Sequence, residues 1–193
     1  MRQCAGGGTR APNHNREMKT VGTETRKRIR SRLAHVEEGG RTYFLTFSAI
    51  RGIKLSLPER EIVLASCRYG HPGQWFLHGV VVMPDHVHML LTPQRVENCA
   101  GEGTRAPNRE REEWMSLGEI VKGIKSVTTR RINQARGIKQ GSVWMEEYYD
   151  RLVRDGEDFT VKLRYLSLNP VKRGLVKSPQ EWDALWIMKS SVV

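Results

Sequence analysis

The sequence predicts an α+β protein with a ferredoxin-like sandwich, in which helices cover one face of an antiparallel sheet and a strand with two histidines is central. Three observations lead to this prediction. The expected elements follow as strand, helix, strand, strand, helix, strand, helix, which contains a strand-helix-strand unit twice. Two apolar runs, WFLHGVVV and HVHMLL, meet at the turn signal Pro84-Asp85. A chain of 193 residues is also long enough to bury the core of one such domain.

The first half of the domain is expected to hold a strand, a helix and the strand pair. Residues 42–49 are rich in the β-branched and aromatic residues that strands favour. Pro58 opens a helical pattern, since proline is tolerated in a first turn. Residues 75–93 read as two antiparallel strands. Because side chains alternate between the faces of a strand, His86 and His88 are expected to point to the same side.

The second half is expected to hold a basic helix, a strand and a final helix. Ser116 and Glu119 form a capping-box pattern that starts the basic helix. Residues 143–154 read as a strand or an edge ribbon. Residues 155–168 have an apolar stripe at helical spacing, and Pro170 is expected to end that helix.

The charge of the chain indicates a polyanionic partner. The net charge is +11 and the isoelectric point is about 10.0, which favours nucleic acid. No apolar run approaches the length of a membrane span and no signal-peptide pattern opens the chain, so we expect no membrane association and a cytoplasmic, nucleoid-associated protein. The three cysteines have no zinc-site spacing. The basic residues of the basic helix have no acidic residues to oppose them, and we expect them to bind DNA. They are Lys122, Lys125, Arg130, Arg131 and Arg136.

The chain divides by composition into three parts. Residues 1–40 are basic and nearly devoid of apolar side chains, which predicts a disordered arm that is either a solvated tail or a non-specific phosphate clamp. The domain is expected at residues 41–177, with a loop insertion at about 95–114, followed by a C-terminal tail at 178–193.

A decapeptide occurs twice outside the expected core. Residues 4–13 read CAGGGTRAPN, and residues 99–108 read CAGEGTRAPN. With suitable synonymous codons, the codons for Cys-Ala-Gly and Thr-Arg-Ala are reverse complements. We therefore hypothesise that each copy translates a DNA hairpin, which the codons of the gene decide.

A nuclease that cuts and rejoins DNA without ATP needs a nucleophile, a cation that polarises the phosphate and a basic surface that holds the strand, and the chain has candidates for all three. Two imidazoles on one strand face can hold a metal ion or a phosphate, although a His-x-His triplet alone is a weak signal. Tyr165 and Asn169 are four residues apart and share a helix face. A tyrosine hydroxyl can attack phosphorus, and an asparagine oxygen one helical turn away can complete a metal site.

The segments VVVMPDHVHMLL and YLSLNPVKRGLV, with the basic helix and VWMEEYYDRLVRD between them, resemble the REP-associated tyrosine transposases of the single-tyrosine HUH superfamily. The similarity spans about residues 42–176. It implies His86 and His88 as the metal-binding pair, Tyr165 as the nucleophile and Asn169 as a third ligand. It also implies Mg²⁺ or Mn²⁺ as cofactor and, as substrate, single-stranded DNA folded into REP-type palindromes that is cut beside the hairpin.

Alternatives stay open at this point. Tyr148 and Tyr149 are rival nucleophiles by chemistry, but they lie in a β-like run where one should face the core, so Tyr165 is preferred. His78 is expected to pack structurally. A hairpin-binding protein without cleavage would bind without metal and without need of Tyr165, and a metal-dependent hydrolase would leave no covalent adduct. We expect a monomer, because no large apolar face is evident.

Overall fold

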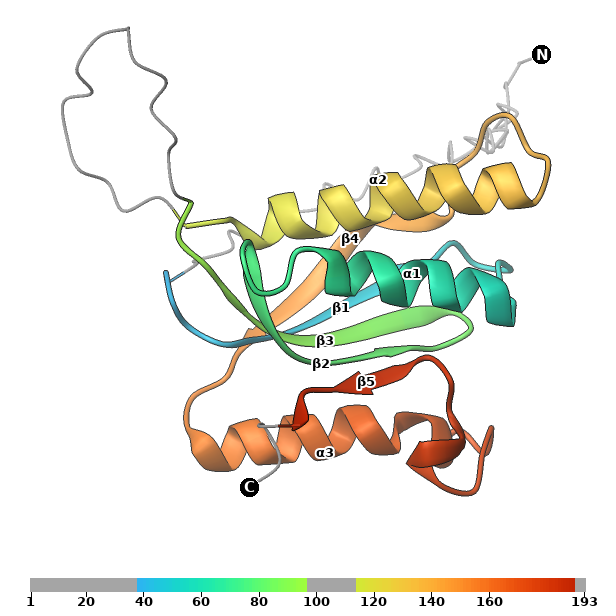
Figure 1. The fold of residues 1–193 in the computed structure, drawn as a ribbon. Coiled ribbons are helices and arrows are strands. Elements are labelled where there is room, and N and C mark those ends of the chain that lie inside the picture. Colours follow the sequence, from blue (N-terminus) through green and yellow to red (C-terminus); the bar gives the residue numbers. More distant parts are fainter. Residues whose placement is uncertain (1–37, 97–113, 190–193) are drawn as a thin grey trace, which may run out of the picture. The chain divides into compact units, whose positions relative to one another are not determined.

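The computed structural model describes residues 38–96 and 114–189, and it contains a five-stranded antiparallel sheet in the order β4-β1-β3-β2-β5 (Figure 1). The α+β class, the antiparallel sheet and the central histidine strand are confirmed, since β3 pairs with β1 on one side and β2 on the other. The elements are β1 (Tyr43–Ala49), α1 (Leu57–Tyr69), β2 (Trp75–Val82), β3 (His86–Pro93), α2 (Leu117–Ala135), β4 (Trp144–Leu152), α3 (Gly156–Lys172), η1 (Pro179–Glu181) and β5 (Leu185–Ile187).

The order of β1 to β4 with α1 and α2 is that of the expected ferredoxin-like sandwich. Strand β1 is buried at every second residue, and Leu45 and Phe47 point into the larger core cluster together with Met89 of β3. Helices α1 and α2 contribute Val63 and Ile124 to the same cluster. Both helices therefore cover one face of the sheet, as expected.

The third helix corrects the prediction that the helices lie on one face. Helix α3 packs on the opposite face of the sheet, where Leu163 and Leu166 meet Val81 of β2 and Leu90 of β3 (Figure 1). The physical reason is that β2 and β3 are apolar on both faces. A second cover is needed to remove those side chains from water.

The end of α3 also differs from the prediction. Helix α3 continues past Pro170 to Lys172. Proline lacks an N–H and its ring crowds the carbonyl four residues earlier, but in the last turn few hydrogen bonds remain to be lost. The buried Pro170 packs at the end of the helix, and Arg173 N donates to Asn169 O, which closes this turn.

The segment expected as a C-terminal tail contributes to the sheet. Residues 185–187 form β5, which pairs with β2 at its outer edge. Trp182 anchors the approach to this strand, because its Nε1 donates to Val82 O at 3.1 Å. This edge of the sheet is therefore built by residues from the far end of the chain.

Other expectations fall outside the described residues. The arm at 1–40 lies almost wholly outside them, as do most of the insertion at about 95–114 and both decapeptides. The arm, the insertion and the domain limits therefore remain predictions. Within residues 38–96 and 114–189, no helix is both long enough and apolar enough to cross a membrane.

Candidate active site

The two histidines lie side by side at the start of the central strand. His86 and His88 share a face of β3, and their ring centroids are 4.6 Å apart. This is the face that α3 covers, because His88 is also in ring contact with Tyr165 of that helix. The alternation of side chains along the strand thus places both rings as expected.

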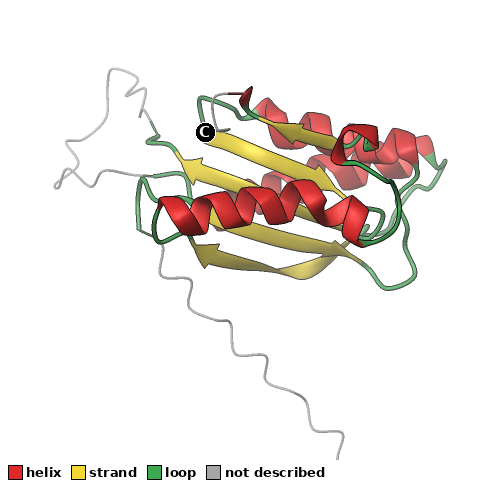
Figure 2. Cartoon of the chain, turned by 90° about the horizontal axis from the view of Figure 1, so that it is seen from below, coloured by secondary structure: helices red, strands yellow, loops and turns green. Residues whose placement is uncertain are grey.

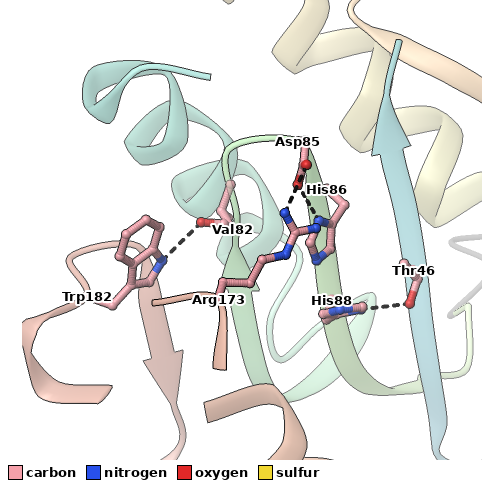
Figure 3. Close-up of polar contacts among 7 residues, drawn as sticks. All are labelled: Thr46, Val82, Asp85, His86, His88, Arg173 and Trp182. Carbon is pink, nitrogen blue, oxygen red and sulfur yellow. Dashed lines mark hydrogen bonds and ion pairs between the residues drawn. The ribbon is translucent and has the colours of Figure 1, made fainter. Parts of the chain in front are cut away.

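Each imidazole has one nitrogen held by an oxygen. Nδ1 of His88 lies 2.8 Å from Thr46 Oγ1, and Nδ1 of His86 lies 2.6 Å from Asp85 Oδ1 (Figure 3). Among the described residues, neither Nε2 has a hydrogen-bond partner. Histidines that bind metals are commonly held in this way, since a partner on one nitrogen fixes the ring and leaves the other nitrogen as ligand.

An ion pair connects this turn to the end of α3. Arg173 Nη1 lies 3.2 Å from Asp85 Oδ2, while the other carboxylate oxygen holds His86 (Figure 3). Burial raises the pKa of Asp85, but the hydrogen bond from His86 and the charges of His86 and Arg173 outweigh it and leave the pKa below its usual range. Asp85 is therefore a carboxylate that orients His86.

Burial sets the charge of the second histidine. His88 is buried, which lowers its pKa to about 3, and the positive charges of His86 and Arg173 act in the same direction. The ring is thus neutral at neutral pH. A neutral imidazole offers a lone pair to a metal ion.

Tyr165 lies beside the histidine pair. Its ring centroid is 5.6 Å from that of His88 and 5.9 Å from that of Phe44 on β1. The side chain is 41% exposed, so the ring is fixed by its neighbours while solvent and ligands can reach it. Lys172 Nζ lies 5.0 Å from the centre of the ring, so a positive charge lies over the face of the ring.

Asn169 lies one turn beyond Tyr165 and is buried. Its Oδ1 is inaccessible to solvent and has no hydrogen-bond partner in the described part of the chain. An orphaned buried oxygen costs about 1–3 kcal/mol, which a bound cation would offset. No group of three His, Cys, Asp or Glu among the described residues can hold a metal ion, so a metal at the histidine pair needs another kind of donor. The residues present therefore fit a divalent cation held by two imidazoles and an amide oxygen.

The basic helix is not part of this site. Helix α2 lies on the opposite face of the sheet from His88 and Tyr165 (Figure 1). Lys125 Nζ donates to the carbonyl oxygens of Met145, Glu146 and Glu147 at 2.9–3.0 Å.

Arg136 is also engaged within the chain, because it pairs with the buried carboxylate of Glu59 through Nε and Nη2. The three other expected DNA-binding residues stay more available on α2: Lys122, Arg130 and Arg131. That α2 binds DNA remains a prediction.

The rival residues are separated by the sheet. Tyr148 packs against the larger core, whereas Tyr149 is 65% exposed. His78 has the structural setting that the sequence indicates, since its Nε2 lies 2.9 Å from Thr92 Oγ1 and its ring contacts Phe159.

Sequence reasoning missed the residues that hold the histidines. Thr46 and Arg173 come from distant parts of the chain, and no local pattern links them to His88 and Asp85. One signal was available. Asp85 directly precedes His86, and a carboxylate next to a candidate metal-binding histidine is a common orienting partner.

Two curated relatives carry the name REP-associated tyrosine transposase. One is from Haemophilus influenzae, 26% identical over 53% of this chain and 53% of the relative. The other is from Escherichia coli K12, 24% identical over 53% of this chain and 48% of the relative. The matched part thus spans about half the length of these relatives. No family model matches the chain.

A solved structure shares the fold. It is described as a REP-associated tyrosine transposase bound to a REP hairpin, and it covers 77% of each chain at 20% identity with a TM-score of 0.53. The chain is therefore related to proteins named REP-associated tyrosine transposases and has their fold.

Proposed function

We propose that the chain is a metal-dependent single-stranded DNA endonuclease and transposase that cuts and rejoins DNA beside REP-type hairpins through a 5′-phosphotyrosine intermediate. The observation that carries the proposal is the position of Tyr165, whose ring lies 5.6 Å from the neutral His88 ring. The names of the two curated relatives support it, as does the fold shared with a transposase bound to a REP hairpin.

The proposed reaction is a transesterification. The Tyr165 oxygen forms a bond to phosphorus and gives up its proton, while the bond from phosphorus to the 3′-oxygen of the preceding nucleotide breaks. The leaving oxygen takes up a proton to become a 3′-hydroxyl. The bond energy is kept in the phosphotyrosine, so a 3′-hydroxyl can reverse the step without ATP.

His86, His88 and Asn169 would hold the cofactor, which we propose is Mg²⁺ or Mn²⁺. A divalent cation there would draw negative charge from the phosphate in the transition state. The chain itself fixes the donors: Thr46 and Asp85 each hold one imidazole, and the α3 backbone sets Asn169 one turn from the nucleophile. Lys172 contributes positive charge beside the Tyr165 ring.

A denaturing gel tests the proposal. The purified chain is mixed with Mn²⁺ or Mg²⁺ and a single-stranded oligonucleotide that carries a palindrome from the flanks of its own gene. We expect a protein-DNA band that resists denaturant, requires the metal and disappears in Tyr165→Phe. Cut DNA without an adduct would instead identify a hydrolase, and binding without either product would identify a hairpin-binding protein.

A further inference from the structure

One row of side chains crosses the sheet through the candidate site. Cross-strand partners in an antiparallel sheet point to the same face. Thr46 of β1 is paired with His88 of β3 on one side and with Tyr149 of β4 on the other. Tyr149 therefore faces the same side as the histidine, two strands away, at about 10 Å.

Beyond α3, no other helix of the described residues packs on this face of the sheet. Helix α3 packs on β2 and β3, and Figure 2, which views the sheet from the side of α3, shows no helix in front of the lower edge strand, β4. On β4, Tyr149 and Arg151 are exposed, whereas the alternate residues Tyr148 and Leu152 point to the core. We call Tyr149 and Arg151, whose β1 partners Thr46 and Phe44 lie on this side of the sheet, the open face.

Tyr149 is an aromatic residue that the fold does not use. It is 65% exposed, and its side chain makes no ring contact, hydrogen bond or ion pair within residues 38–96 and 114–189. An exposed aromatic ring on a strand is a platform for an unpaired base, because every base has a face that can stack. The hydrophobic effect alone would disfavour this exposure.

Two positively charged side chains lie between Tyr149 and the candidate site, next to the Phe44 ring. Arg151 is the cross-strand partner of Phe44, whose ring is 5.2 Å from that of His88. Lys162 Nζ lies 5.8 Å from the centre of the same Phe44 ring. A phosphate above Phe44 would thus meet two cations close to Tyr165.

We propose that the open face is the track for the unpaired nucleotides next to the cleaved phosphate, with Tyr149 stacking on a base and Arg151 contacting the backbone. This inference rests on the proposed function, since it takes single-stranded DNA as the substrate. Glu147 is exposed two residues before Tyr149, on the side away from Arg151, and repels phosphate. The backbone is therefore directed to the Arg151 end and the base to Tyr149.

Binding measurements test the track. All variants are made in a Tyr165→Phe background, so that the DNA is bound but not cut. The probes are a fluorescein-labelled palindromic hairpin with unpaired flanks and the same hairpin without flanks, each with Mn²⁺. We expect Tyr149→Ala to weaken binding of the flanked hairpin by about 5- to 150-fold, the range of one base-aromatic stack, and to leave the flankless hairpin unchanged.

Three comparisons sharpen the assignment. Tyr149→Phe keeps the ring and should bind as the parent does. Arg151→Ala should lower the slope of log K against log salt by about one on the flanked probe only. Tyr69→Ala serves as the matched control, since Tyr69 is 88% exposed on α1, on the other face of the sheet, and its loss should change nothing.

Equal binding of the flanked hairpin by Tyr149→Ala and its parent would overturn the proposal. So would a covalent adduct that needs the Tyr149 hydroxyl, or a Tyr149→Ala effect on self-association instead of flank binding, which would assign the open face to a second copy of the chain. The proposed function fails separately: flank binding that depends on Tyr149, with no adduct formed by the unmutated chain, would support the track and reject the nuclease.

Discussion

The Tyr165 and His88 rings meet edge to face, with centroids 5.6 Å apart and planes inclined by 66°. One ring comes from α3 and the other from the central strand, so the helix and the sheet each contribute one part of the site. This contact depends on α3 lying on the face of the sheet opposite α1 and α2. The same placement exposes Tyr165 enough for a large substrate to reach it.

The first prediction concerns the hydroxyl that holds His88. Thr46→Val keeps the shape of the side chain and removes the partner of Nδ1. We expect Mn²⁺ affinity, measured by calorimetry, to fall about 10- to 100-fold, as is typical when a residue that orients a ligand is lost. Thr42→Val is the control, because Thr42 directly precedes β1 and its hydroxyl bonds Thr92 at the far end of β3 from His88. Equal losses in both variants would show that the effect is not local to His88.

The second prediction concerns the unpaired oxygen of Asn169. Asn169→Leu removes a buried acceptor that has no partner, so without metal the free energy of unfolding should rise by about 1 kcal/mol. Mn²⁺ should stabilise the parent chain and fail to stabilise the variant, as thermal unfolding with and without the ion would show.

Asn133→Leu is the matched control for this prediction. Asn133 is similarly buried, but its Nδ2 donates to Gly141 O at 2.7 Å. Loss of this bond should destabilise the chain by about 1 kcal/mol and leave the response to Mn²⁺ intact. If Asn169→Leu is as destabilising as the control, the Asn169 oxygen is not an orphan in solution.

The third prediction concerns acid stability. The hydrogen bond from Arg136, together with those from Ser56, outweighs burial and lowers the pKa of Glu59 from 4.5 to about 2. Since the folded carboxyl holds its proton less tightly than the unfolded one, its contribution is complete above pH 4.5 and is lost as the pH falls toward 2. We expect this loss to reach about 3 kcal/mol in denaturant titrations at a series of pH values.

Glu59→Gln should remove this part of the pH dependence. Glu61→Gln, on the exposed side of the same helix, is the control and should keep it. A wild-type stability that does not change between pH 4.5 and 2 would contradict the assignment.

The fourth prediction separates the basic residues of α2. Lys125→Met removes an ammonium that bonds three carbonyls at the start of β4, so stability should fall by about 2 kcal/mol. Lys122→Met removes an exposed charge. If α2 binds DNA, this variant should keep its stability and lower the salt slope of hairpin binding by about one. An unchanged slope in Lys122→Met would count against DNA binding at this position.

Much of the fold could be predicted because its signals are local. The capping box of Ser116 and Glu119 is present at the start of α2, and the turn at Pro84-Asp85 joins β2 to β3. The same pattern in Ser56 and Glu59 starts α1 one residue before Pro58. The start of α1 could therefore also be predicted from the sequence.

The features that the sequence did not predict depend on contacts between residues far apart in the chain. The face on which α3 packs is decided by the second apolar side of β2 and β3, which no single helix pattern reveals. The partners of the histidines have the same origin: Thr46 comes from the neighbouring strand, and Arg173 reaches Asp85 from the end of α3. The spacing of Tyr165 and Asn169 was predictable because one helix carries both.

The strand and helix order up to Leu152 already completes a ferredoxin-like unit, and α3 and β5 follow it. The histidines and Thr46 therefore belong to this unit, while Tyr165, the proposed nucleophile, lies on a helix that follows it. If Tyr165 is the nucleophile, a substitution at this exposed position can remove the proposed cleavage while the apolar side of α3 still covers β2 and β3. In evolutionary terms, a descendant of such a gene could lose the proposed enzymatic step and still keep a folded domain available for binding.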